Sequence, residues 1–136
     1  MSQLPLPIIL DTNFITVPAD FSVDIFSETE TILERRLKFV LLQSVVREIE
    51  AKASQAKASH KKFRIAKAFF KRCNIVEVSE SLSKLTVDDQ LLEYTISVNG
   101  ILATNDRELR RRAREKGVPV LFLRGKKRLV LEGISI

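Results

Sequence analysis

Short apolar runs alternate along the chain with longer stretches in which apolar residues recur every three or four positions. An apolar run of about four residues between turn-forming residues is typical of a buried strand, and the longer spacing is typical of an amphipathic helix. Strands are therefore predicted over residues 8–10, 39–42, 75–78, 101–104 and 118–123, with a further short edge element over 129–131. Helices are predicted over residues 21–36 with Ser22 as N-cap, from Ser44 onward, and over 63–73, 87–98 and 107–116.

This alternation predicts an α/β fold, a three-layer α/β/α arrangement with a central, mainly parallel sheet. Right-handed crossovers then bring the carboxyl ends of the strands to one edge of the sheet. One domain over residues 1–136 is expected, because the length suits a single core and no change in composition marks a boundary. Residues 51–59 are rich in Ala, Lys, Ser and Gln, and their composition fits either a helix extension or a connection.

Two of the predicted strands end close to an aspartate. Residues 7–10 run directly into Asp11, and residues 100–103 run into Thr104, Asn105 and Asp106. Ligands of open α/β sheets bind outside the carboxyl ends of the strands. If the two strands are neighbours, their acids face each other and repel, so the pattern suggests a divalent cation between them.

Further acids stand where helices begin or lie near the same edge. Asp88 and Asp89 open the helix over 87–98, and Glu48 lies in the helix that starts at Ser44. Each has an ordinary structural explanation, because acids in a first turn complement the helix dipole and aspartate is a good N-cap. Their joint occurrence along one predicted edge is what favours a functional site.

Composition narrows the classes of protein that remain. The chain has 45% hydrophobic and 29% charged residues, as expected for a globular protein, and no apolar run approaches a membrane span. No signal peptide is recognised, and Cys73 stands alone, so a disulfide framework is excluded and a reducing, cytoplasmic setting is expected. Cys73 itself is interpreted as a small core residue.

Positive charge is concentrated in two segments rather than spread evenly. The formal net charge is +6, and residues 51–76 contain no acid, while residues 107–128 carry ten basic residues against two glutamates. Such clustering is typical of proteins that bind a phosphate backbone, although a solvated helix face is the ordinary alternative. The predicted RNA contacts are Lys61, Lys62, Arg64, Arg107, Arg110 and Arg111. His60 lies far from every acidic motif and is interpreted as a surface residue.

The acids occur in four short motifs. Asp11 stands in Leu-Asp-Thr-Asn, Glu48 in Val-Val-Arg-Glu-Ile, Asp88 in Val-Asp-Asp-Gln-Leu-Leu, and Asp106 in Ala-Thr-Asn-Asp-Arg-Glu-Leu. In this order and spacing, over residues 8–122, the chain resembles the PIN-domain nucleases. Residues 101–112 together with Gly117-Val118-Pro119 are most similar to small archaeal PIN proteins related to ribosomal-RNA-processing proteins and to VapC-type toxins.

The resemblance implies a ribonuclease that binds one or two Mg²⁺ or Mn²⁺ ions through an acidic quartet. The residues that match the quartet are Asp11, Glu48, Asp88 and Asp106, and those that match supporting polar positions are Thr12, Asn13 and Thr104. Asp88 and Asp89 are adjacent, and the choice of metal ligand between them stays open. The family further implies a homodimer, and an antitoxin or a ribosome-assembly protein as partner.

The chemistry of these residue types leads to the same hypothesis. Magnesium prefers oxygen ligands and keeps several waters, so a few carboxylates at a sheet edge suffice to hold it. A metal ion acidifies water and stabilises charge on a phosphate, which together permit hydrolysis of RNA to a 5′-phosphate and a 3′-hydroxyl.

Two other classes of protein fit the sequence less well. A non-catalytic RNA-binding scaffold of the same fold would have lost acids, and none is missing. A phosphoryl-transfer domain of the dehalogenase type needs a second acid two residues after Asp11, where Asn13 stands, and a response-regulator receiver needs an acid pair that does not precede Asp11.

Overall fold

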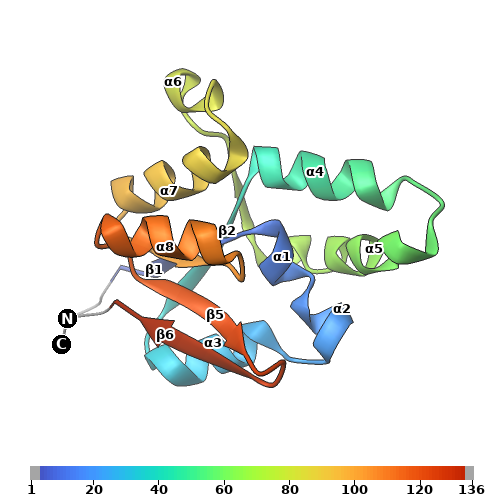
Figure 1. The fold of residues 1–136 in the computed structure, drawn as a ribbon, viewed down its shortest axis with the longest axis horizontal. Helices are drawn as coiled ribbons and strands as arrows, with labels where there is room; N and C mark the ends of the chain where they lie inside the picture. The colour runs from blue at the N-terminus through green and yellow to red at the C-terminus, as the bar shows by residue number, and fades with distance from the viewer. Residues whose placement is uncertain (1–3, 134–136) are drawn as a thin grey trace.

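A six-stranded sheet forms the centre of the protein in a computed structural model that describes residues 4–133 (Figure 1). The strand order is β3-β2-β1-β4-β5-β6; neighbours are parallel except β5 and β6, which are antiparallel. The strands are β1 (Leu6–Leu10), β2 (Leu37–Leu42), β3 (Asn74–Val76), β4 (Ile101–Ala103), β5 (Val120–Arg124) and β6 (Arg128–Glu132). The predicted α/β class with a mainly parallel sheet is confirmed, and the edge element over 129–131 belongs to β6.

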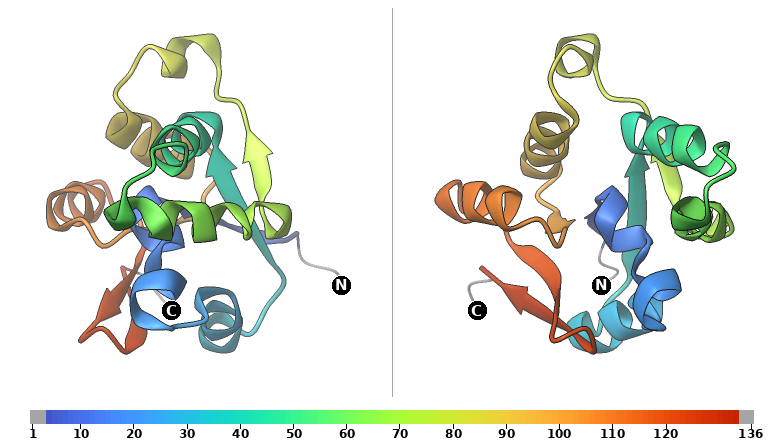
Figure 2. Two further views of the ribbon diagram at one scale, coloured as in Figure 1. Left: turned by 90° about the vertical axis from the view of Figure 1, so that its right-hand side faces the viewer. Right: turned by 45° about the vertical axis from the view of Figure 1, so that its right-hand side comes forward.

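Helices cover both faces of this sheet. They are α1 (Thr12–Ile15), α2 (Val17–Phe21), α3 (Ile25–Leu33), α4 (Gln43–Ala53), η1 (Ala58–His60), α5 (Lys61–Lys67), η2 (Phe70–Arg72), α6 (Glu80–Ser83), α7 (Val87–Ser97) and α8 (Arg107–Glu115). Helix α7 packs against β1 and β4, and α8 against β5, while α4 packs against β2 and β3. In the right-hand view of Figure 2, α7 and α8 lie on one side of the sheet and α4 and α5 on the other.

The central strands consist of unbroken apolar runs because they lie in the core of the protein. Ile8, Ile9 and Leu10 of β1 are fully buried, because β1 has strands on both sides and helices on both faces. From α7, Leu91 and Leu92 complete the core with no exposed surface. Within residues 4–133, no helix combines the length and the apolar character that crossing a bilayer requires.

The single helix predicted over 21–36 is wrong. Instead α2 ends at Phe21, and the next residue, Ser22, adopts a left-handed φ of 55° and is the C-cap of α2 rather than an N-cap. A second helix, α3, begins after Asp24, whose carboxylate accepts hydrogen bonds from the N–H groups of Phe26 and Ser27, each at 3.1 Å. The signal for this break was present in the sequence, because aspartate is a preferred N-cap.

The basic segment that follows α4 is broken into short pieces. Helix α4 begins at Gln43, one residue before the predicted start, and ends at Ala53, so the undecided residues 51–59 are α-helical only at their beginning and enter the 3-10 helix η1 at their end. The helix predicted over 63–73 is divided between α5 and η2, and β3 ends at Val76 before reaching Val78. Arg64 donates to the carbonyl oxygens of Gln55 at 2.9 Å and Lys57 at 3.3 Å, which ties the connection to α5.

Candidate active site

The carboxyl ends of β1 and β4 lie side by side, as the sequence predicted. Leu10 is in register with Ala103, and the N–H of Asp11 donates to the carbonyl oxygen of Ala103 at 2.9 Å. The hydroxyl of Thr104 then donates to Asp11 Oδ2 at 2.7 Å. The sheet itself therefore positions Asp11, and a residue from the neighbouring strand fixes the orientation of its carboxylate.

Asp11 is a buried carboxylate with an unfavourable electrostatic environment. Its side chain is 7% exposed, and burial raises its pKa above the ordinary value. Hydrogen bonds from Thr104 and from the N–H of Thr12, the latter at 2.7 Å, oppose this increase. Nearby Asp88 and Glu48 raise the pKa further, because their negative charges repel an ionised Asp11.

An open cavity of about 480 Å³ lies at this edge of the sheet, and acids from five different parts of the fold line it. Asp11 follows β1, Glu48 comes from α4, Asp88 from the first turn of α7, and Asp106 precedes α8; the fifth acid, Asp20 of α2, was not predicted. The structure thus brings the whole predicted quartet to one place. Thr12 and Asn13 also line this cavity, and His60 does not.

Glu48 is held by contacts on both of its carboxylate oxygens. Thr12 donates its hydroxyl to Glu48 Oε1, and Lys52 Nζ lies 3.6 Å from Oε2. The threonine side chain therefore couples the position of Glu48 to the turn that carries Asp11. Thr12, one of the predicted supporting residues, thus holds the carboxylate of Glu48.

The structure separates the two adjacent acids of α7. Asp89 forms an ion pair with Arg112 of α8 and does not line the cavity, and the hydrogen bond from Arg112 lowers its pKa. Asp88 is exposed to solvent but lines the cavity. Its partial burial raises its pKa, and the negative charge of Asp106 raises this pKa further. Arg112 opposes this increase, so the arginine favours the charged form of both acids.

Asp106 caps a helix and also lines the cavity. Its Oδ1 accepts a hydrogen bond from the N–H of Leu109 at 2.8 Å, which makes it the N-cap of α8, and it also lines the cavity. The N–H of Asp106 donates to the hydroxyl of Thr104 at 3.1 Å. Thr104 therefore links the two aspartates that follow β1 and β4.

Asn105 is a site residue that sequence reasoning did not single out. Its N–H donates to Asn13 Oδ1 at 2.9 Å, and its Nδ2 donates to the carbonyl oxygen of Asn13 at 3.2 Å. Its own Oδ1 accepts from the N–H of Leu123 at 2.7 Å. The two asparagines thereby join the segments that follow β1 and β4 to strand β5.

The donor set of the cavity suits a hydrated divalent cation. Among residues 4–133, no three His, Cys, Asp or Glu side chains are gathered tightly enough to enclose a metal ion by themselves. Magnesium is usually held by one or two carboxylates and keeps several waters, so a tighter group is not required. Burial is the main cause of the raised pKa values of Asp11 and Asp88, and the negative charges of neighbouring acids add to it, so a cation would relieve part of this penalty.

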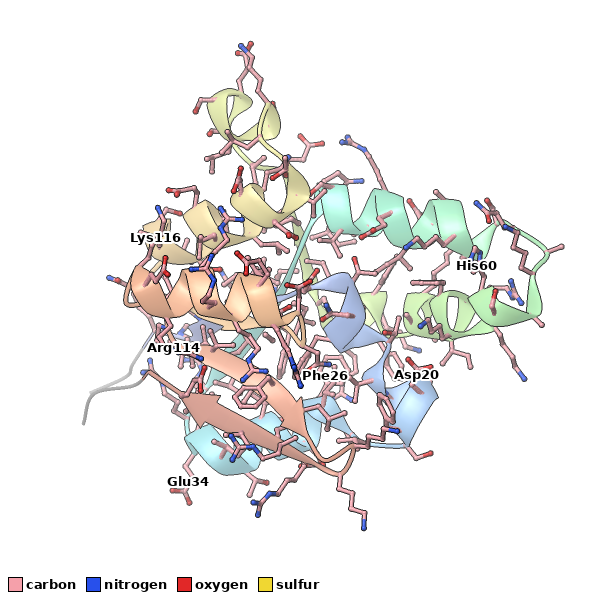
Figure 3. All side chains as sticks on the ribbon, in the orientation of Figure 1. Asp20, Phe26, Glu34, His60, Arg114 and Lys116 are labelled. Carbon is pink, nitrogen blue, oxygen red and sulfur yellow. The ribbon has the colours of Figure 1, made fainter. Side chains whose placement is uncertain are left out.

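The predicted RNA contacts do not form one surface. Lys62 lines the acidic cavity and pairs with Asp20 at 3.6 Å, on the side of α2 that faces α5 (Figure 3). Arg64 is committed to backbone carbonyls, and Arg111 forms ion pairs with Glu108 and Glu115 of its own helix. Arg107, Arg110 and Arg111 line a separate hollow, and Lys61 lines neither it nor the acidic cavity.

The mainly parallel sheet and the carboxylates gathered at its strand ends agree with the predicted resemblance to PIN-domain proteins. The chain belongs to the family described as the PIN like domain, whose model matches residues 8–126. It is 28% identical to Ribonuclease VapC4 of Methanocaldococcus jannaschii over 93% of this chain and 97% of that protein. It is 34% identical to Ribonuclease VapC9 of Archaeoglobus fulgidus over 70% of this chain and 67% of that protein.

Solved structures agree with this assignment. The PIN domain endonuclease Utp24 superposes with a TM-score of 0.78 and 25% identity, covering 96% of this chain and 93% of that one. A VapBC2 structure from Rickettsia felis, bound to a DNA fragment from its promoter, superposes with a TM-score of 0.65 over 88% of this chain and all of that one. Its 16% identity supports the fold alone. The predicted resemblance to PIN-domain proteins is confirmed.

Proposed function

We propose that this protein is an endoribonuclease that hydrolyses RNA phosphodiester bonds with the help of a carboxylate-bound Mg²⁺ or Mn²⁺ ion. The observation that carries the proposal is the convergence of Asp11, Glu48, Asp88 and Asp106 on one open cavity. The two relatives named as ribonucleases support the same reaction. The acids that line the open cavity would attract a cation rather than the phosphate itself.

The four acids have distinct tasks in this proposal. When bound, a divalent cation supplies positive charge to the scissile phosphate and acidifies water. Asp11 and Asp106 would be the principal ligands; Thr104 orients the carboxylate of Asp11 and holds the backbone N–H of Asp106. Asp88 would bind the cation directly or through water, and Glu48, held by Thr12, would complete the ligand shell or orient the attacking water. The products would carry a 5′-phosphate and a 3′-hydroxyl.

Two biological roles are compatible with this chemistry. As a VapC-type toxin in the cytoplasm, the protein would form a homodimer and pair with an antitoxin whose peptide covers the acidic cavity. As a processing nuclease it would act on a structured precursor RNA beside a ribosome-assembly protein. The VapC relatives support the first role, and the likeness to the endonuclease Utp24 supports the second.

The alternative is a PIN scaffold that binds RNA without cleaving it. All four acids are present and line one cavity, which favours the enzyme. A metal titration separates the two proposals, because a scaffold would show little Mn²⁺-dependent rise in its melting temperature.

The direct test compares Asp11→Asn with Asp89→Asn on single-stranded RNA in the presence of Mn²⁺. Both changes remove one carboxylate charge, but only Asp11 lines the cavity. Asp11→Asn is expected to lower the cleavage rate by more than about a hundredfold, since loss of outer-sphere partners alone costs up to about that much. Asp89→Asn should retain most activity. Cleavage by Asp11→Asn at the wild-type rate would refute the proposal.

A further inference from the structure

A second hollow lies beside the acidic cavity and has the opposite charge. It occupies about 580 Å³ between one face of α8 and the strand β5. Its charged lining consists only of arginines: Arg107, Arg110, Arg111, Arg114 and Arg124. Figure 3 shows Arg114 where α8 faces the β5–β6 hairpin. Nothing in the proposed cleavage reaction uses this hollow.

The spacing of the arginines on α8 explains how the hollow is built. Residues three and four positions apart share one helix face, so Arg107, Arg110 and Arg114 point toward the same side. The Arg110 guanidinium carbon lies 3.5 Å from the centre of the Phe122 ring, and that of Arg124 lies 5.4 Å from it. Phe122 is buried, so its ring serves as a platform that positions guanidinium groups rather than nucleobases.

The positive charge in this hollow is only partly neutralised. Arg111 is paired with glutamates of its own helix, and Arg114 lies 3.4 Å from Glu132 of β6. Within residues 4–133, no ion pair involves Arg107, Arg110 or Arg124.

Arg110 lies in the least favourable environment of the arginines that line the hollow. Its Nε is buried without a hydrogen-bond partner among the described residues. Burial lowers the pKa of Arg110, Glu132 opposes this decrease, and the neighbouring Arg114, Arg107 and Arg124 lower it further. Gathered like charges are unfavourable, and a bound anion with several acceptor oxygens would relieve their repulsion.

The hollow adjoins the acidic cavity through Asn105. Asn105 lines the cavity, and its Oδ1 accepts the hydrogen bond from Leu123, which lines the hollow. Arg107 also follows Asp106 directly at the start of α8. A strand of RNA in the acidic cavity could therefore continue past Asn105 into the arginine-lined hollow without crossing another element.

We propose that this hollow is a phosphate-binding subsite that holds the RNA backbone next to the bond to be cleaved, with Arg107 and Arg124 as its phosphate-contacting residues. The identity of the nucleic acid rests on the proposed function. Guanidinium groups bind phosphate through paired N–H donors, and the hollow adjoins the cavity in which RNA would be cleaved, so a phosphate of that RNA is the proposed occupant. Arg110, fixed on Phe122, is a positioning residue of this subsite. Arg114 and Arg124 are not among the RNA contacts predicted from the sequence.

The experiment measures binding of a fluorescein-labelled oligouridine in EDTA, where cleavage does not interfere. The double variant Arg107→Gln with Arg124→Gln is compared with a control of equal net charge, Lys38→Gln with Lys84→Gln. All four side chains are exposed, and neither control lysine lines the hollow or the acidic cavity. Arg110 is left intact, because its removal would uncover Phe122.

The arginine variant should bind more weakly, and its affinity should depend less on salt. The slope of log K against log salt is expected to fall by about 0.7 for each phosphate of the single strand that the variant no longer neutralises. The control variant should keep the wild-type slope. Equal effects of both variants, or an unchanged affinity of the arginine variant, would overturn the proposal; in the latter case an acidic protein segment would be the better occupant.

This result is independent of whether the protein cleaves RNA. If the wild type fails to cleave in Mn²⁺ but the arginine variant shows a lower affinity and a smaller slope, the nuclease proposal fails and the subsite stands. If the wild type cleaves and the arginine variant binds as tightly as it does, the subsite fails and the nuclease stands.

Discussion

The hydroxyl of Thr104 donates a 2.7 Å hydrogen bond to Oδ2 of Asp11, although the two residues lie 93 positions apart in the chain. The same hydroxyl oxygen accepts the N–H of Asp106 at 3.1 Å. One fully buried threonine therefore sets the spacing of two acids from neighbouring strands. The parallel pairing of β1 with β4 makes this possible, because it brings both strand ends to one level.

Replacing Thr104 with Val keeps the shape of the side chain and removes this link. Asp11 and the N–H of Asp106 would each lose a partner, so the free energy of unfolding is expected to fall by about 1–3 kcal/mol. Cleavage should fall by about 10- to 100-fold, as for other outer-sphere changes at metal sites. Urea denaturation and a cleavage assay measure the two effects. Thr31→Val, at an exposed helix position, is the control. A Thr104→Val protein as stable as this control would contradict the role of Thr104 as a link between Asp11 and Asp106.

Asp88→Asn should stabilise the protein at neutral pH in EDTA. The pKa of Asp88 is raised in the folded state, so ionisation is less favourable there than in the unfolded chain. The resulting penalty is absent below the ordinary value near 3.8, develops as the pH rises above it, and persists at neutral pH. Asp88→Asn is therefore expected to raise the free energy of unfolding only at pH values above the ordinary pKa. Solvent screening keeps this increase modest because Asp88 is exposed.

Asp89→Asn is the matched comparison and should act in the opposite direction. Its pKa is lowered by the hydrogen bond from Arg112, so its contribution to stability is present above the ordinary value and is lost as the pH falls. Urea denaturation of both variants at neutral and acidic pH tests the pair. The same sign for both variants at neutral pH would contradict the different environments of these neighbours.

A divalent cation should stabilise the wild type more than Asp88→Asn. A ligand that binds only the folded state at about 100 times its dissociation constant adds about 2.7 kcal/mol. Differential scanning calorimetry with and without Mn²⁺ measures this gain, and EDTA should reverse it. Calcium-free buffers ensure that calcium does not compete with Mn²⁺. An equal gain in both proteins would argue against a role for Asp88 in binding the cation.

Gly100→Ala should weaken the pairing that creates the site. A Cβ at this position would lie 2.8 Å from Ile9 Cδ1 and 2.8 Å from the carbonyl oxygen of Pro7. Because the carbonyl belongs to the backbone of β1, the strand must shift, and a destabilisation of about 1–3 kcal/mol is expected. Chemical denaturation measures it. A neutral effect would mean that β1 and β4 are farther apart at this end.

Cys73 should react slowly with alkylating reagents while the protein is folded. Burial raises the pKa of its thiol to about 12, against a smaller lowering by Arg72, so little thiolate exists at mildly alkaline pH. The thiol also donates to the carbonyl oxygen of Phe69 at 3.5 Å. Mass spectrometry after iodoacetamide treatment should show fast modification only in denaturant. Equal rates in both states would mean that the thiol is accessible and ionised in the folded protein.

Local patterns were enough to predict the elements whose character is set by their own residues. The runs that became β1 and β4 are apolar because both faces of these strands are buried, and the acids that follow them are next to them in the chain. The order of the four acidic motifs likewise identified the family, which the comparisons confirmed. The break between α2 and α3 was missed because apolar spacing continued across it, while the capping role of Asp24 decided the outcome.

What the sequence by itself determined was therefore the α/β class, the parallel sheet and the presence of acids at its edge, since each follows from residues close together in the chain. Only the tertiary structure decided which acids share the cavity. Arg112, 23 residues beyond Asp89, forms an ion pair with that acid, whereas Asp88 lines the cavity. The approach of α8 to β5 likewise gathered arginines around Phe122, because packing between distant elements determines which charges become neighbours.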